Sequence, residues 1–197
     1  MKAPVARKMI TKMRYQAATY FNPGTTLAVR VFSANSLFDP DRSGVGHQPR
    51  GFDQLVGVLY DHYVVIGAKI IIQFAPEVDG NTKSTQLCGV AIKDNATTTD
   101  KTGYMESGYC KYSLMSPEAG YRTTVSYKLN PNKFLGRSKP LSDPDLKGDA
   151  SSNPTEEVFF HVFTGPLDSA SAANDVFANV VIEYTVALIE PKLPAIS

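Results

Sequence analysis

The residues that could do chemistry are few in this chain, and their spacing argues against an enzyme. The three histidines, His47, His62 and His161, form no H-x-H pair, and none is followed by a glutamate at the spacing of a metal site. The sequence also lacks a G-x-S-x-G nucleophile motif and a G-x-x-x-x-G-K-[ST] phosphate loop. We therefore expect a protein that is not an enzyme and needs no cofactor.

The remaining candidate groups have simple structural interpretations. Cys88 and Cys110 are too few for a disulfide framework and have no metal-ligand spacing, which favours buried, reduced thiols. His161 lies between Phe160 and Val162 in an apolar run, which favours a packed or interface histidine.

One stretch is similar to the start of a calcium-binding loop. Residues 39–44, Asp-Pro-Asp-Arg-Ser-Gly, fit the pattern D-x-D-x-[DNS]-G, but the twelfth position is Arg50, where such a loop needs a bidentate glutamate. An Asp/Pro/Gly turn is the simpler interpretation. A calcium ion held by Asp39 and Asp41 between two chains stays open as the alternative.

Positive charge is concentrated at the N-terminus. No acidic residue precedes Asp39, and the residues from there on include 14 basic and 19 acidic ones, a balance of −5. A basic segment on a mildly acidic body is typical of an arm that contacts polyanions. Phosphate contacts need positive charge but no fixed geometry, although an ordinary solvated strand edge would have the same pattern. The predicted nucleic-acid-binding residues are Lys2, Arg7, Lys8, Lys12 and Arg14.

Period-2 alternation of apolar and polar residues dominates the chain and predicts eight strands. The alternation is clear over 26–32, 64–74, 121–129 and 178–188, and weaker over 9–20, 87–93, 109–114 and 158–163. In 64–74 it places all even positions, from Val64 to Phe74, on one core face. The connections 75–85, 94–108 and 136–156 exceed hairpin turns. This combination predicts an all-β fold, an eight-stranded antiparallel jelly roll made of two sheets.

One segment departs from this alternation. Phe52, Leu55, Val56 and Leu59 fall at helical spacing, with Tyr63 extending the stripe, which predicts a short helix over 51–60 at one end of the sandwich. We expect a basic arm over 1–14 leading into the first strand, a jelly-roll domain over 9–190 and a tail over 191–197. No apolar run reaches the ~20 residues of a membrane span, and no secretory h-region follows the first residues.

Two of the predicted strands are apolar on both faces. Phe159 and Phe163 lie opposite the core positions of strand 158–163, and Phe177, Val181, Ala187 and Ile189 lie opposite those of the last strand. Exposed apolar faces of this size need a cover, and the sequence offers few helices to supply one. We therefore expect neighbouring copies of the chain to cover them.

Three motifs within residues 35–74 carry a family resemblance. They are Asn35-Ser36-Leu37-Phe38-Asp39-Pro40-Asp41, Gly46-His47-Gln48-Pro49-x-Gly51-Phe52-Asp53-Gln54, and Tyr60-x-x-Tyr63-x-Val65-x-Gly67-x-Lys69-Ile70. The segment resembles single-jelly-roll capsid proteins of small circular Rep-encoding single-stranded DNA viruses, and is similar to coats of small plant RNA satellites. The second motif is the specific one, and the match covers about 40 of the 197 residues.

The resemblance implies a virion coat protein. Copies of the chain would form an icosahedral shell, T=1, around single-stranded DNA, assembled inside the host cell with the nucleus as the expected site; a host receptor is implied but not specified. The N-terminal arm would point inward, although this chain has only the short basic stretch through Arg14 in place of a long arginine-rich arm. The implied structural and subunit-contact residues are His47, Gln48, Pro49, Gly51, Phe52, Asp53, Gln54, Tyr60 and Tyr63.

A trimeric jelly-roll recognition module, lectin-like or cytokine-like, is the alternative from another functional class. Such a module would be expected to have a secretion signal or a disulfide, and the sequence indicates neither.

Overall fold

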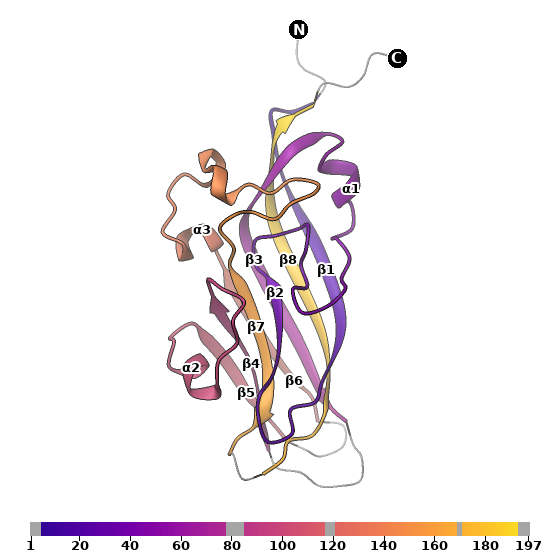
Figure 1. Cartoon of the computed structure of the whole chain (residues 1–197). Coiled ribbons are helices and arrows are strands. Elements are labelled where there is room, and N and C mark those ends of the chain that lie inside the picture. The colour runs from indigo at the N-terminus through magenta and orange to yellow at the C-terminus, as the bar shows by residue number, and fades with distance from the viewer. Residues whose placement is uncertain (1–4, 78–84, 117–120, 169–170, 193–197) are drawn as a thin grey trace.

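Two packed antiparallel sheets form the molecule in a computed structural model that describes residues 5–77, 85–116, 121–168 and 171–192 (Figure 1). The strands are β1 (Lys8–Phe21), β2 (Ala28–Ser33), β3 (Tyr60–Pro76), β4 (Gln86–Lys93), β5 (Cys110–Met115), β6 (Thr123–Leu129), β7 (Phe159–Pro166) and β8 (Val176–Pro191). The short helices are α1 (Phe52–Leu55), α2 (Lys101–Met105) and α3 (Pro131–Phe134), with 3-10 turns η1 (Pro140–Ser142) and η2 (Pro144–Leu146).

The strand order is that of a jelly roll. One sheet runs β1-β8-β3-β6 and the other runs β2-β7-β4-β5. Along the chain, β4 and β5 are consecutive neighbours in one sheet, and every other connection crosses from one sheet to the other. Long crossing connections between two four-stranded sheets define this fold, so the predicted eight-stranded antiparallel jelly roll is confirmed.

The core lies between the two sheets, where alternation places one side chain of every two. The predicted core run of β8, from Ala178 to Leu188 at even positions, is buried, and Met13 and Tyr15 of β1 meet it. Phe160 and Val162 of β7 and Ile70 and Ile72 of β3 complete the same cluster. Each fully buried large apolar side chain contributes roughly 1.5–3 kcal/mol, which makes this layer the main source of stability.

The even-position core face predicted for β3 is wrong at its start. A register shift against β8 lies between Val65 and Gly67. A bulge of this kind inserts one residue and reverses the side of the sheet to which the following side chains point. As a result Tyr63 and Val65 join the central core, whereas Val64 belongs to a separate cluster on the other face of the sheet.

The predicted helix over 51–60 is also shorter than expected. Helix α1 has four residues, because Val56 is already extended (φ −90, ψ 130) and Gly57 takes φ 83. That left-handed conformation favours glycine and turns the chain, and the Gly57 N–H donates to Tyr60 O at 2.7 Å. Phe52 and Val56 are buried as predicted, but Leu59 is 37% exposed and Tyr63 belongs to β3.

The chain itself covers most of the outward apolar side chains, so the expectation that neighbouring copies cover them is wrong for Phe159, Phe163 and Ile189, whereas Phe177 stays 52% exposed. Tyr104 of α2 stacks on Phe163 with ring centroids 5.1 Å apart, and Gly89 leaves the space that this phenylalanine fills. Leu146 from the β6–β7 connection packs on Val64 and Ile189 at the other sheet. Sequence periodicity misses such covers because they come from loops distant in the chain.

Tyr104 also makes a buried pair with His161. His161 Nε2 lies 2.8 Å from Asn95 O, so it donates there, and Nδ1 accepts from the Tyr104 hydroxyl at 2.9 Å. Burial lowers the pKa of His161 from its usual 6.5 to about 4. Burial likewise raises the pKa of Cys88 to about 12 and that of Cys110 to about 11, which keeps both thiols protonated at neutral pH.

His161 predicts a fold that is sensitive to acid. Below pH 6.5 the His161 ring is protonated in the unfolded chain, whereas in the folded chain it stays neutral down to about pH 4. The contribution of His161 to the free energy of unfolding is therefore fully present above pH 6.5 and is lost as the pH drops through this window. Between pH 7 and pH 5 we expect a loss of about 2 kcal/mol from this group. Urea denaturation at the two pH values measures it. The His161→Gln variant should lose most of this difference and His47→Gln should keep it; an unchanged difference in His161→Gln would contradict the assignment.

No helix within the described ranges is long and apolar enough to cross a membrane.

Candidate nucleic-acid interface

The β1-β8-β3-β6 sheet brings basic side chains from three strands onto its outer face. In one row across the sheet, Arg14 is paired with Glu183, Glu183 with Lys69, and Lys69 with Lys128. Lys12 lies two residues before Arg14 on the same side of β1, opposite Thr185. We call this surface the cationic face; its basic residues are Lys8, Lys12, Arg14, Lys69 and Lys128.

Glu183 is the carboxylate within the cationic face, and it stays ionised there. Its ion pair and hydrogen bond with Arg14 lower its pKa, and Lys69 and Lys12 add to that shift. Arg14 keeps 68% of its side chain exposed while making this pair. The cationic face therefore keeps a clear excess of positive charge.

Lys69 and Lys128 face each other directly across β3 and β6. Like charges at directly opposed positions of two strands destabilise a sheet by a few tenths of a kcal/mol. Holding them together is therefore a cost to the fold that an anionic ligand would relieve.

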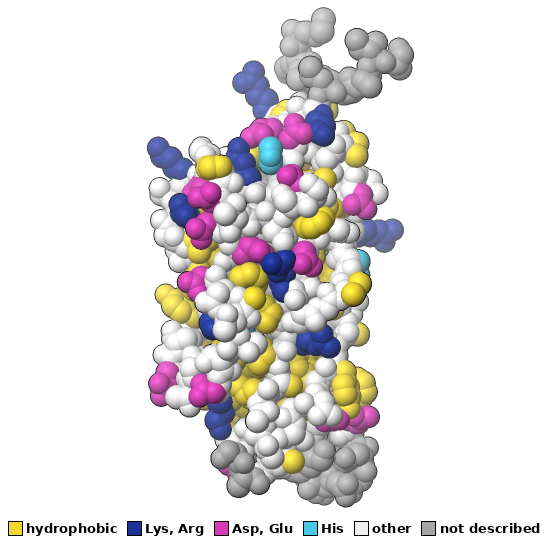
Figure 2. All heavy atoms as spheres, viewed as in Figure 1, with side chains coloured by type: hydrophobic (Ala, Val, Ile, Leu, Met, Phe, Trp, Pro, Cys, Tyr) yellow, Lys and Arg dark blue, Asp and Glu magenta, His cyan; other side chains and the backbone are white. Residues whose placement is uncertain are grey.

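The other side of the molecule differs from the cationic face. Figure 2, viewed from the side on which β2 and β7 lie nearest, shows basic and acidic side chains intermingled.

The structure places the basic residues predicted from the sequence as follows. Lys2 lies outside the described residues, and Arg7 is exposed just before β1. Lys8, Lys12 and Arg14 alternate with the buried Met13 and Tyr15, on the side expected from the period. Sequence analysis missed Lys69 and Lys128 as site residues. Alternation had already placed both opposite the core, but only strand pairing shows that they join the N-terminal charges.

The 46–51 part of the specific motif braces the edge strand β1. His47 Nε2 lies 3.2 Å from Gln16 O of β1, its Nδ1 lies 2.8 Å from Gln48 O, and its ring is 4.9 Å from that of Tyr15. Gln48 Nε2 donates to Phe38 O at 3.3 Å, and Pro49 is buried. Gly51 has φ 90 and starts α1. The loop thus covers one side of an edge that would otherwise stand open.

Tyr60 and Tyr63 are buried within their own chain, so the subunit contact implied for them is wrong and a structural role remains. Tyr63 is fully buried, its hydroxyl accepts from the backbone N–H groups of Leu37 and Phe38, and its ring meets Phe52 edge-on at 6.0 Å. Tyr60 is 2% exposed and donates to Ala6 O at 3.0 Å. Asp53 and Gln54 are exposed on α1, and their subunit contact stays a prediction.

The acidic residues of the 39–44 loop have partners within the loop. Asp39 pairs with Arg42 at 2.7 Å, and Asp41 Oδ1 accepts from Ser43 N at 3.0 Å, as an Asp turn does. Arg42 also reaches Glu157 at 3.2 Å. Within the part of the chain that the structure describes, no three His, Cys, Asp or Glu side chains gather as a metal site would require.

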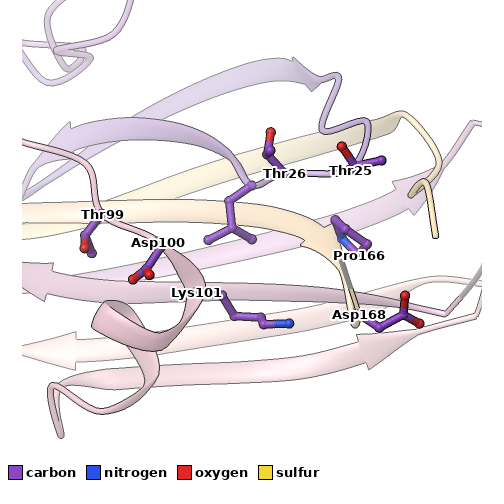
Figure 3. Close-up of a pocket in the computed structure, with 8 residues that line it drawn as sticks. Thr25, Thr26, Thr99, Asp100, Lys101, Pro166 and Asp168 are labelled. Carbon is purple, nitrogen blue, oxygen red and sulfur yellow. The ribbon is translucent and has the colours of Figure 1, made fainter. Parts of the chain in front are cut away.

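A separate hollow of about 310 Å³ opens between α2 and the ends of β2 and β7 (Figure 3). Leu27 and Pro166 contribute apolar surface to it, and Lys101 reaches across from α2 toward Pro166 and Asp168. The Lys101 ammonium donates to Leu167 O at 2.6 Å, and Asp100 Oδ1 caps α2 by accepting from Gly103 N at 2.8 Å. These charged groups therefore secure the loop over the β2-β7-β4-β5 sheet, and the cationic face is the better candidate site.

The sequence matches no known protein family and no curated protein. Among solved structures, it is similar to Desmodium yellow mottle tymovirus, with 14% identity over 100% of this chain and 97% of that chain and a TM-score of 0.49. It is also similar to the decameric BFDV capsid protein, with 16% identity over 92% and 99% of the two chains and a TM-score of 0.48. A semi-empty VLP of the Macrobrachium rosenbergii nodavirus matches with 12% identity over 98% and 100% and a TM-score of 0.49.

Proposed function

We propose that this chain is the coat subunit of a small icosahedral virus, assembling with copies of itself into a T=1 shell around a single-stranded DNA genome. The observation that supports the proposal most is the cationic face. It places five basic side chains on the outside of one sheet, where phosphates can reach them. The predicted arm over 1–14 is shorter in the structure, because β1 already begins at Lys8, and Lys2 and Arg7 before this strand would extend the cationic face.

The chemistry of this face suits a polyanion that is bound without regard to sequence. Lysine and arginine side chains on a sheet neutralise phosphates through charge and release counterions, and they need no base contacts. A shell that must enclose a whole genome needs this kind of binding. The cationic face would then line the interior, and the β2-β7-β4-β5 sheet would face outward. The protein would be a virion component assembled in the host cell, with the nucleus as the expected site.

The resemblance of residues 35–74 to capsid proteins is the second support. The motif residues brace β1, which carries Lys8, Lys12 and Arg14, so they hold the predicted nucleic-acid contacts in place. The same segment leaves α1 at the surface, with Asp53 and Gln54 exposed. A structural role and a subunit contact therefore fit together on one loop.

Negative-stain microscopy of the purified protein, combined with absorbance at 260 and 280 nm on the same fraction, tests the proposal. Uniform closed particles with raised absorbance at 260 nm are the expected result. A monomer or trimer that persists across salt and protein concentrations would contradict the shell, and particles free of nucleic acid at low salt would contradict the role of the cationic face.

The contact proposed for α1 predicts an assembly defect without a folding defect. Replacing Asp53 and Gln54 with lysine puts two new positive charges into the proposed contact, where unmatched charge disfavours association. We expect at least about tenfold fewer particles, the effect of about 1.4 kcal/mol per contact, with an unchanged melting temperature. The control replaces Thr102 of α2 and Glu106, which directly follows this helix, with lysine; both are exposed. Normal particle yield from the α1 variant would remove Asp53 and Gln54 from the contact.

A further inference from the structure

Two aromatic rings lie exposed on the same outer face as the basic residues. Tyr20 and Phe177 are cross-strand partners at the far end of β1 and β8, with ring centroids 5.0 Å apart. Tyr20 is 40% exposed and Phe177 is 52% exposed. Leaving two adjacent aromatic rings in water is unfavourable, so a ligand that covers them would gain binding energy.

The rings border a shallow hollow that is suited to a flat ligand. The hollow has a volume of about 390 Å³ and is lined by Ala18, Thr19, Tyr20, Phe177, Ala178 and Asn179. The Tyr20 hydroxyl lies 2.6 Å from a Glu77 carboxylate oxygen and 2.5 Å from an Asp175 carboxylate oxygen and shares its one proton between them, which fixes the orientation of its ring. Both carboxylates contact the hydroxyl, so the face of the Tyr20 ring stays open. Their negative charge disfavours phosphate at that end of the hollow.

Polar amides connect the aromatic pair to the cationic face. Gln16 Nε2 donates to Asn179 Oδ1 at 2.7 Å, and Asn179 Nδ2 donates to Gln73 Oε1 at 3.2 Å, so a chain of amides crosses β1, β8 and β3. Tyr20 and Arg14 are six residues apart on one side of β1, or about 20 Å. A single strand of a few nucleotides spans that distance, which lies within the site sizes of about 4–16 nucleotides known for single-strand-binding folds.

We propose that Tyr20 and Phe177 form a stacking platform for unpaired bases of a single-stranded nucleic acid whose phosphates lie along Lys12, Arg14, Lys69 and Lys128. The inference rests on the proposed function and adds to it a preference for unpaired bases. Charge complementarity favours this occupant, because the aromatic pair is continuous with a face that attracts a polyanion. Aromatic rings accept any base, so the platform would add affinity without sequence preference.

A comparison of two single-stranded 12-mers on the full-length protein tests the platform. One is an oligothymidylate and the other is an abasic strand with the same phosphates and no bases. Fluorescence anisotropy should show that the wild type binds the thymidylate about tenfold more tightly, the effect of stacking about one base. Phe177→Ala should lose that preference by weakening thymidylate binding about tenfold while leaving abasic binding unchanged. Phe177→Tyr should keep the preference, and Tyr112→Ala, at an exposed tyrosine on β5 of the other sheet, should not alter it.

The outcomes separate this inference from the proposed function. Equal affinity of the wild type for the two strands would overturn the stacking platform and leave the charge-based function intact. Binding of neither strand at low salt would overturn both. If Phe177→Ala lowers particle yield and keeps the preference for thymidylate, the aromatic pair is a contact between copies and the platform is wrong.

Discussion

Replacing Lys12, Lys69 and Lys128 together with glutamine is expected to weaken binding of single-stranded DNA about 100-fold at 0.1 M salt. Each phosphate contact on a single strand contributes about 0.7 to the slope of log affinity against log salt concentration, so three lost contacts lower the slope by about 2. If the affinities of the two proteins are taken as equal at 1 M salt, a difference of about 2 in slope makes the affinity of the variant about 100-fold lower at 0.1 M salt. Titrations at several salt concentrations measure both quantities on one protein.

The fold of this triple variant should remain intact. The opposed Lys69 and Lys128 repel each other, so replacing both with a neutral residue should leave the melting temperature unchanged or raise it slightly. The matched control replaces Lys93 of β4, Lys101 of α2 and Lys111 of β5, which belong to the other sheet and the helix over it, with the same change of charge. Equal weakening by both triple variants would mean that net charge alone governs binding, and would falsify the assignment of the cationic face.

The Tyr63→Phe variant is expected to lose about 4 kcal/mol of folding stability, because one hydroxyl bonds to three groups, two of them buried and one half-buried. Tyr63 Oη accepts from Leu37 N at 3.1 Å and from Phe38 N at 3.3 Å, and it lies 3.2 Å from Ser36 Oγ. Ser36 Oγ already donates to Asn153 Oδ1 at 2.6 Å, so the tyrosine hydroxyl donates to the serine. Removing the hydroxyl leaves two backbone N–H groups and one serine oxygen without this partner inside the protein.

Thermal or urea denaturation measures this loss, and a fall in melting temperature of about 8–16 °C corresponds to it for a chain of this size. Tyr60→Phe is the matched control, because that hydroxyl makes a single bond to Ala6 O next to the chain terminus, and about 1 kcal/mol is expected. A loss below 1 kcal/mol in Tyr63→Phe would show that water or a shifted loop replaces the hydroxyl, and that the 36–38 loop does not depend on it.

The Tyr63→Phe variant and the triple lysine-to-glutamine variant also distinguish the role of the 35–74 segment from that of the cationic face. Tyr63 holds residues 36–38 and pairs its backbone with Gly148, where a Cβ would overlap the tyrosine ring. A destabilised Tyr63→Phe protein that still binds nucleic acid at low temperature would assign this region to the fold. The triple variant that replaces Lys12, Lys69 and Lys128 with glutamine should show the reverse, with weak nucleic-acid binding in a stable protein.

The amino-acid sequence by itself determined the strands and the two sides of most of them. Alternation depends only on neighbours in the chain, so it correctly placed Lys12 and Arg14 opposite Met13 and Tyr15, and predicted the buried face of β8. Strand number and long connections were enough for the jelly roll, because few all-β arrangements accommodate eight strands that are rarely joined by hairpins.

Tertiary structure decided what depends on residues far apart in the chain. Pairing of β3 with β6 and β8 brings Lys69, Lys128 and Glu183 beside Arg14, and pairing of β1 with β8 joins Tyr20 to Phe177. The bulge after Val65 reverses one side of β3, and Tyr104 covers Phe163 from a loop 59 positions away in sequence. Local periodicity holds no information about register or cover, because both are fixed by packing between segments that meet only in the folded chain.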